Sequence, residues 1–279
     1  MNSILFGLLS ALSWGGGDFF GGLASRKAGA YRAVLYAEVI GLAMLFGALV
    51  FTGESQPPLQ KMLLAGLAGA IGTGGLLILY QAMIVGQMSI ATPVSALLAA
   101  TLPVVVGTIL DGLPSLPKLV GFGLALLAVW LVAQEDSPKS QLMRFSDLRL
   151  PLVAGVCFGT YFVLMHQASD SAVVWPMVAS RTGGSILMVG FMLTLRHDWR
   201  ISNNKAWPLV MVNAVLDVGG NIFYILASQT GRMDVSAVIS SLYPGTTVLL
   251  AWLVLKEKIN RLQWLGIAAA LGAIALMTV

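Results

Sequence analysis

GTGGLLILYQAMIVGQ, at residues 72–87, returns 145 residues later and without a gap as DVGGNIFYILASQTGR, at residues 217–232. The shift superimposes small residues on small residues: Gly74, Gly75, Ala82 and Gly86 on Gly219, Gly220, Ala227 and Gly231. The same register reaches Gly121 on Gly266, and a shift of 144 places SWG at Ser13 on CFG at Cys157. The alternative, a chance likeness of segments rich in glycine and leucine, fits so long a register poorly. Repeats of this kind predict one structural unit used twice.

The composition indicates that this unit is built for lipid. Hydrophobic residues make up 57% of the chain, charged residues only 10%, and the mean hydropathy is +0.86. A soluble domain carries about 25% charged residues, so this chain cannot cover a water-facing surface. The net charge of +4 does not indicate a nucleic-acid partner, because the basic residues are scattered through short loops between apolar runs.

Apolar runs long enough to cross a membrane follow one another along the chain. We place them at 4–24, 31–51, 61–84, 89–110, 116–134, 149–168, 173–195, 206–228, 234–255 and 261–279. The longest polar break lies at the centre, so we expect a first repeat over 1–134, a linker over 135–148 and a second repeat over 149–279. Five spans is an odd number, so the second copy must be inverted, an arrangement typical of transporters. The predicted fold is therefore an all-α polytopic membrane protein of ten transmembrane helices in two inverted five-helix repeats.

Lysine and arginine predict the orientation of the protein in the membrane. Twelve of the sixteen follow the odd-numbered spans: Arg26, Lys27, Arg32, Lys139, Arg144, Arg149, Arg196, Arg200, Lys205, Lys256, Lys258 and Arg261. Three follow the even-numbered spans, namely Lys61, Lys118 and Arg232, and Arg181 lies within the seventh. Basic residues favour the cytoplasmic side. We therefore expect a cytoplasmic linker, both termini outside, and a location in the bacterial plasma (inner) membrane.

Two motifs resemble a known family. LSWGGGDFFGG from Leu12 and SSLYPGTTVLLAWLVLKEKINRLQWLGIAAALGAIAL from Ser240 are similar to the EamA-type, ten-helix members of the drug/metabolite transporter superfamily. The first repeat is more diverged, because its matching loop, DGLPSLPK from Asp111, lacks the Lys-Glu-Lys charges. The resemblance covers the whole chain. It implies export of metabolites such as amino acids by alternating access, through a cavity lined mainly by helices other than the fifth and tenth. It does not fix the substrate.

A few ionisable side chains lie at membrane depth. Such a group costs at least about 2.5–3.5 kcal/mol, so each is a functional candidate. They include Asp18 in the first span, Glu38 in the second, Arg181 in the seventh and Asp217 in the eighth. Arg181 facing Glu38 or Asp217 would suit a zwitterion, but the same residues could form a structural ion pair. Because three carboxylates accompany one arginine, a carboxylate without a partner could also couple transport to protons.

Polar residues form a stripe on the eighth span. Asn213, Asp217 and Asn221 recur at i, i+4 spacing, with Ser228 farther along and Tyr224 beside them, so they share one helix face. The matching positions of the third span are apolar or small. The stripe faces either a water-filled cavity, where it would bind substrate, or a neighbouring helix that it holds by hydrogen bonds.

Prolines interrupt two spans that correspond in the repeats. Pro244 lies among Ser236, Ser240, Tyr243 and Thr247 in the ninth span, and Pro93 and Pro103 lie near Thr92 and Ser95 in the fourth. Helices broken at matching positions would indicate a binding site, whereas ordinary kinks would not. In the first span, Trp14 shares a face with Asp18, where it could stack on a substrate or pack in the core.

These observations predict an alternating-access transporter that exports small metabolites, with amino acids or related zwitterions as substrates. The alternative substrates are amphipathic organic cations, and a third reading is a membrane protein without transport activity. The candidate binding residues are Trp14, Asp18, Glu38, Ser95, Arg181, Asn213, Asp217, Asn221, Tyr224, Ser240 and Tyr243. No phosphate loop or metal-ligand cluster occurs, so we expect no enzyme activity and no cofactor. The expected partners are a small-molecule substrate and the lipid bilayer, coupling to protons is left open, and we expect a monomer.

Overall fold

The computed structural model describes residues 2–85, 88–132, 134, 145–256 and 260–277, and within them every regular element is helical. The helices are α1 (Asn2–Ala28), α2 (Ala30–Thr52), α3 (Leu59–Val85), α4 (Met88–Asp111), α5 (Leu116–Val132), α6 (Phe145–Ala168), α7 (Val174–Thr194), α8 (Trp207–Thr230), α9 (Met233–Ser240), α10 (Tyr243–Leu255) and α11 (Arg261–Met277), with a short 3-10 helix, η1 (Asn204–Ala206). Eight spans are long and apolar enough to cross a membrane, and α5 and α11 are shorter apolar helices of 17 residues each. Because about 17 residues is the lower limit for a span, these ten segments match the predicted ten transmembrane helices.

The helices differ from the expectation in two details. Helix α6 begins at Phe145, inside the predicted linker, although its membrane-spanning part runs over Arg149–Ala168 as predicted, and residues 135–144 lie outside the described part of the chain. The fourth span is not broken, because α4 runs continuously through Pro93 and Pro103. The predicted break in the ninth span is confirmed: α9 ends at Ser240 and α10 begins at Tyr243, with Pro244 in its first turn. Proline is well tolerated there, since the first amides of a helix have no intrahelical partner.

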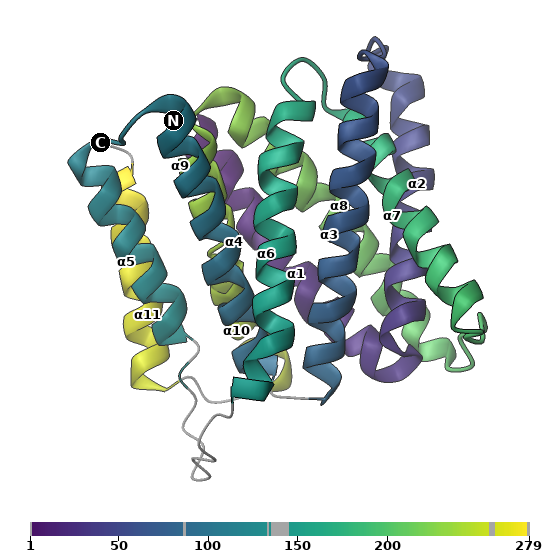
Figure 1. The fold of residues 1–279 in the computed structure, drawn as a ribbon. Coiled ribbons are helices and arrows are strands. Elements are labelled where there is room, and N and C mark those ends of the chain that lie inside the picture. Colours follow the sequence, from purple (N-terminus) through teal and green to yellow (C-terminus); the bar gives the residue numbers. More distant parts are fainter. Residues whose placement is uncertain (1, 86–87, 133, 135–144, 257–259, 278–279) are drawn as a thin grey trace.

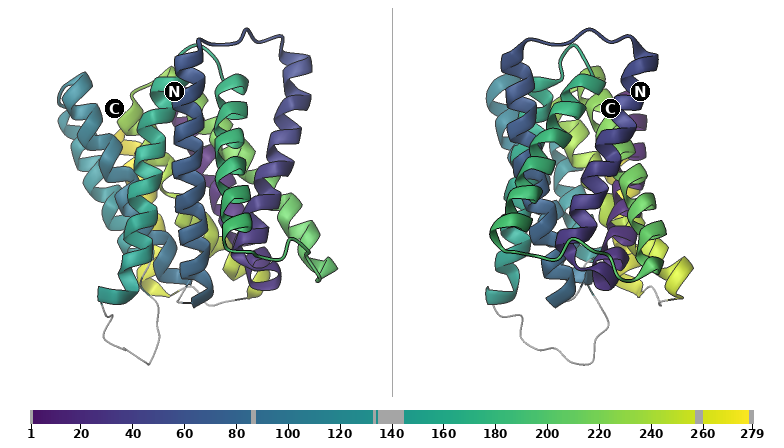
Figure 2. Two further views of the ribbon diagram at one scale, coloured as in Figure 1. Left: turned by 45° about the vertical axis from the view of Figure 1, so that its right-hand side comes forward. Right: turned by 90° about the vertical axis from the view of Figure 1, so that its right-hand side faces the viewer.

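The chain crosses the bundle in an up-and-down order. Both termini lie at one face of the bundle, here called the terminal face, and α5 ends and α6 begins at the opposite face, here called the linker face (Figures 1 and 2). In a pair of inverted repeats, each helix of one repeat packs on the other repeat in the same way as its counterpart does in return. The observed packing has this form. Helix α1 packs on α8 as α6 packs on α3, and α4 packs on α6 as α9 and α10 pack on α1. The two repeats therefore interlock, while α5 and α11 pair at one edge (Figure 1).

One helix crossing breaks this pseudo-symmetry. A Cβ atom on Gly69 of α3 would lie 1.9 Å from the carbonyl oxygen of Ser180 in α7, and one on Gly183 would lie 2.0 Å from that of Gly66. The two backbones thus touch directly, as small residues permit in membranes. The shifts of 145 and 144 place Met211, Ala214, Tyr36 and Val39 at the equivalent crossing of α8 and α2. Larger side chains separate that second pair, so α2 and α7 are packed differently.

Polar contacts tie the segments together at the terminal face. The carboxylate of Glu54, in the loop after α2, accepts hydrogen bonds from the backbone N–H groups of Val173, Val174 and Trp175 at 2.7, 2.8 and 2.9 Å. Lys61 donates to the Asp170 carboxylate, and this ammonium holds the pKa of Asp170 below its usual range. The contacts fix the start of α7 and the loop before it.

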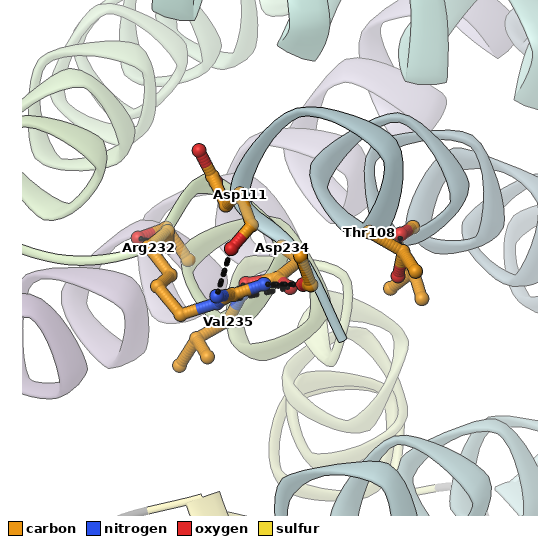
Figure 3. A network of polar contacts seen from close by, with 8 residues as sticks. Thr108, Asp111, Arg232, Asp234 and Val235 are labelled. Atoms are coloured by element: carbon orange, nitrogen blue, oxygen red, sulfur yellow. Dashed lines mark hydrogen bonds and ion pairs between the residues drawn. The ribbon is translucent and has the colours of Figure 1, made fainter. Parts of the chain in front are cut away.

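A second polar network joins α4 to α9 at the same face (Figure 3). The Arg232 guanidinium donates to the carbonyl oxygen of Gly112 at 3.0 Å and, more weakly, to that of Asp111 at 3.4 Å. It also pairs with the fully buried Asp234 carboxylate at 2.8 Å. A cation at the C-terminal end of α4 is favourable because the carbonyl groups there are negative. The hydrogen bond to Asp234 raises the pKa of Arg232 above its ordinary value.

Candidate substrate-binding cavity

A cavity lies where the two repeats meet. Its empty space is about 630 Å³, counting its open part. The first repeat lines it with Trp14, Asp18, Glu38, Gly69, Gly72, Thr73 and Leu76, and the second with Phe158, Tyr161, Phe162, Ser180, Arg181, Asp217, Asn221 and Tyr243. Both repeats contribute to the wall, and α5 and α11 supply no lining residue among those that the structure describes. A cavity between inverted repeats is where transporters bind their substrates.

Three charged residues form what we call the ion triad. Nη1 of Arg181 donates to Oε1 of Glu38 at 2.9 Å, and Nη2 donates to Oδ2 of Asp217. The side chains of Arg181 and Glu38 are each only 4% exposed, whereas that of Asp217 is 18% exposed. Thr73 adds a hydrogen bond to Oε1 of Glu38 at 3.0 Å. The triad therefore joins α2, α7 and α8, and both ends of the guanidinium are occupied by carboxylates.

A third carboxylate lines the cavity without a counter-ion. Asp18 is 8% exposed and makes no ion pair or hydrogen bond within the described part of the chain. Its neighbours on α1 are Gly17 and Gly21, which pack on Asn213 and on the Tyr80 hydroxyl. If all four groups are ionised, the cavity holds three negative charges and one positive charge. A buried charge requires compensation, so in that ionised state the cavity is complementary to a cation.

Aromatic rings form much of the remaining wall. Trp14 stacks on Phe162 with ring centroids 5.3 Å apart, and Phe162 stacks on Tyr224 at 4.6 Å. Tyr224 lies behind this layer, where its hydroxyl donates to the carbonyl oxygen of Phe162 at 2.9 Å. Ring faces attract cations as well as apolar groups, and the attraction increases where water is excluded. Trp14 thus packs in the core and also lines the cavity, and its stacking on a substrate stays a prediction.

The sequence left open whether the polar stripe on α8 faces a cavity or a neighbouring helix, and its residues divide between these two positions. Asp217 and Asn221 line the cavity, and Asn221 donates to the carbonyl oxygen of Asp217 at 2.6 Å while accepting from the Tyr161 hydroxyl. Asn213 instead accepts from the Tyr80 hydroxyl at 3.3 Å. Ser228 donates to the carbonyl oxygen of Ile225 in its own helix. The middle of the stripe faces the cavity, and its ends make contacts within and between helices.

The break between α9 and α10 brings one candidate to the cavity. Tyr243 lines it, and the Tyr243 hydroxyl lies 3.2 Å from the hydroxyl of Ser95 on α4. Ser240 is fully buried, and its hydroxyl has no partner among the described residues. Thr247 donates to the carbonyl oxygen of Gly15 at 3.1 Å, so α10 is fixed against α1.

Seven of the eleven predicted binding residues thus line the cavity, and four do not. The lining residues are Trp14, Asp18, Glu38, Arg181, Asp217, Asn221 and Tyr243. Ser95, Asn213, Tyr224 and Ser240 lie behind the wall or in helix contacts. A role in substrate binding stays a prediction for all eleven.

Sequence reasoning missed the hydroxyl-bearing residues of the wall. Thr73, Tyr161 and Ser180 were not singled out, although Thr73 contacts Glu38 and Tyr161 contacts Asn221. One signal was present: Thr73 lies inside the repeated glycine-rich stretch, and Ser180 directly precedes Arg181. Hydroxyl residues are common in membrane helices, so neither position stands out by residue type alone.

Comparisons with known proteins agree with this architecture. A family model described as the EamA-like transporter family matches residues 1–134 and again residues 148–279. An uncharacterized protein of Methanocaldococcus jannaschii is 27% identical over 121 residues, which cover 43% of this chain and 86% of that protein. A protein crystal structure superimposes with a TM-score of 0.78 over 99% of this chain and 96% of that one. At 15% sequence identity, this last likeness concerns the fold alone.

Proposed function

Because the chain belongs to the EamA-like transporter family, we propose that it is a membrane transporter for small organic molecules that carry a protonated amine. The observation that supports this substrate class is the charge balance of the cavity. The carboxylates of Asp18, Glu38 and Asp217 line the cavity together with one guanidinium, which the ion triad already engages at both ends. A substrate ammonium supplies the missing positive charge, and a carboxylate can bind it by a charge-assisted hydrogen bond.

The aromatic wall supports an amine attached to an apolar body. Trp14, Phe158 and Phe162 line the cavity together with the acidic residues. An amphipathic cation would place its ammonium near Asp18 or Asp217 and its apolar part against the rings. This proposal corresponds to the second substrate class that the sequence suggested.

Zwitterions such as amino acids are the second candidate. Arg181 favours them, because Nη2 reaches the more accessible carboxylate of the triad and could instead bind the carboxylate of a substrate. To do so, the substrate must displace Asp217 from the guanidinium and bring a further negative charge into an acidic cavity. Charge balance therefore ranks amino acids behind simple amines.

Alternating access between the two repeats is the transport mechanism that we propose. Interlocked inverted repeats can exchange their packing, so that α2 and α7 each open one face in turn. Export, rather than import, is the direction expected from the family resemblance. A monomer in the plasma membrane with both termini outside, and coupling to protons, are further parts of this proposal.

A matched set of competitors would test the substrate class. The purified protein is reconstituted into liposomes, and the uptake of radiolabelled phenethylamine is measured. Unlabelled phenethylamine, phenylalanine or N-acetylphenylalanine is added as a competitor. We expect phenethylamine to compete best, phenylalanine less well, and N-acetylphenylalanine not at all, because it has no ammonium group. Competition by phenylalanine without competition by phenethylamine would favour the zwitterion. Equal competition by the acetylated compound would contradict both amine-based proposals.

A further inference from the structure

We propose that Arg181 is a resident cation that occupies Asp217 when the transporter is empty and yields that carboxylate to the substrate ammonium. In this arrangement Arg181 allows the empty protein to change its orientation. The inference rests on the proposed amine-binding function and assigns a role to a residue that amine recognition alone does not require.

The two arms of the ion triad differ, and the difference makes one of them exchangeable. The Glu38 arm is almost completely buried and is supported by the Thr73 hydroxyl. Helix α7 packs tightly there, since a Cβ atom on Gly184 would lie 3.0 Å from Oε2 of Glu38. The Asp217 arm is more exposed and faces the cavity. Of the two arms, an incoming ammonium therefore meets the Asp217 arm first, and Arg181 remains held by Glu38.

Charge explains why an empty cavity needs a cation of its own. Glu38 and Asp217 come from different repeats, on α2 and α8, and α2 also packs on α7. Without a cation between them, the carboxylates of Glu38 and Asp217 would repel each other between α2 and α8, the helices that move relative to each other during transport. A positive charge on α7 joins all three helices and reduces that cost. The ligand-free protein can then reorient without leaving the charges of Glu38 and Asp217 unpaired.

The role separates two kinds of transport. Net movement of substrate requires the empty protein to return, whereas exchange of substrate inside for substrate outside does not. If the ammonium replaces the guanidinium on Asp217, a protein without Arg181 still has a cation there whenever substrate is bound. Removal of the guanidinium should therefore impair net transport far more than exchange.

The experiment compares these two modes in liposomes loaded with radiolabelled phenethylamine. Release into amine-free buffer measures net transport, and release into buffer that contains unlabelled phenethylamine measures exchange. We expect Arg181→Gln to lower net release at least about tenfold, because a buried carboxylate of the empty protein then loses its partner. Exchange should fall no more than about threefold, because the substrate ammonium occupies Asp217 in that mode. Added guanidinium ions should restore net release. Lys61→Gln is the control, because Lys61 pairs with Asp170 and not with a residue of the ion triad. Net release and exchange should both persist in this variant.

Other outcomes would overturn the inference. Equal loss of exchange and net release in a well-folded Arg181→Gln protein, without rescue by guanidinium, would give Arg181 a purely structural role or a role in substrate binding. If the single variant does not fold, Glu38→Gln combined with Arg181→Gln removes a carboxylate together with the cation, and the same split between the modes is expected. No phenethylamine exchange by the wild-type protein would reject the amine-binding function itself, and the inference with it.

Discussion

Gly184 of α7 shows how little space surrounds the ion triad at the scale of single residues. A Cβ atom at this position would lie 2.2 Å from the Thr73 hydroxyl oxygen and 3.0 Å from Oε2 of Glu38. Any side chain must push Thr73 or Glu38 out of place. The hydrogen bond to a charged group that would be lost is worth about 1.5–3 kcal/mol.

Gly184→Ala should therefore weaken amine binding, and we expect its apparent affinity for phenethylamine to fall roughly tenfold or more, since each 1.4 kcal/mol is about tenfold. The measurement is the concentration dependence of exchange in liposomes. Gly190→Ala is a matched control on the same helix, because a Cβ atom there has no neighbour within 4 Å. Equal affinity in both variants would show that the geometry around Thr73 and Glu38 is not required for binding.

The sequence predicts the members of the ion triad better than their pairing. Each of Glu38, Arg181 and Asp217 is conspicuous because ionisable residues are rare at membrane depth. Their pairing depends on how α2, α7 and α8 pack, and the sequence offers no local signal for contacts over 143 residues, as between Glu38 and Arg181. An ion pair and a substrate site were thus equally open from the sequence, whereas the structure brings the pair and the cavity together.

At the scale of helices, the start of α7 is capped by a residue that is distant in sequence. The Glu54 carboxylate accepts from three consecutive N–H groups, and the Glu54 carbonyl oxygen accepts from the Trp175 indole at 2.9 Å. A shift of 144 places Asp198 at the equivalent position of the second repeat. Asp198 instead lies 3.8 Å from Nη2 of Arg32, in an exposed pair, and accepts from the N–H of Arg200. The start of α2 therefore lacks the carboxylate cap of α7, although Arg32 and Tyr36 donate hydrogen bonds to the carbonyl oxygens of Asp198 and Trp199 at 2.6 and 2.8 Å.

Glu54→Gln should lower the stability of the protein by about 0.5–2 kcal/mol, because the N-terminal end of a helix favours a negative charge and a capping acceptor. The measurement is thermal unfolding in detergent, where we expect a lower Tm. Asp170→Asn is the control, since Asp170 is an exposed acid at the same face and exposed ion pairs contribute about 0–1 kcal/mol. A Tm that falls equally in both variants would argue against a special role for the cap.

Proline had different outcomes in the two equivalent spans. Pro244 opens α10 at a helix start, but Pro93 and Pro103 remain inside a continuous α4. Helix α6 packs closely on the segment between them: a Cβ atom on Gly155 would lie 2.6 Å from the carbonyl oxygen of Ser95. Close packing alone does not explain the difference, because a Cβ atom on Gly15 of α1 would lie 2.4 Å from the carbonyl oxygen of Tyr243, at the start of α10. Sequence alone marks the weak points of a helix and does not say which of them breaks.

At the scale of the whole molecule, the sequence predicts the topology of the bundle well, because an internal repeat limits how the spans can be oriented. An internal repeat of five spans requires opposite orientations in a membrane, and the interlocked packing of α1 with α8 and of α6 with α3 has that form. The tight crossing of α3 and α7 was less predictable. It depends on Gly66, Gly69 and Gly183 meeting across two repeats, and their counterparts are larger residues.

The orientation of the molecule gives a further prediction. The termini share one face (Figure 1), and most of the lysine and arginine residues that the structure describes lie at helix ends or in loops of the other. Basic loops stay in the cytoplasm, so the linker face should be inside and the terminal face outside. Gln56 lies in the exposed loop between α2 and α3 at the terminal face, and Ser202 lies in the exposed loop before α8 at the linker face.

Labelling of single cysteines in intact cells would test this orientation. In a Cys157→Ser background, we expect Gln56→Cys to react with a membrane-impermeant maleimide from outside. Ser202→Cys should react only after the cells are made permeable. The reverse pattern would show that the protein is inserted the other way, and labelling of both sites in intact cells would show two orientations. Because inverted repeats form much the same bundle in either orientation, the distribution of basic residues alone carries this prediction.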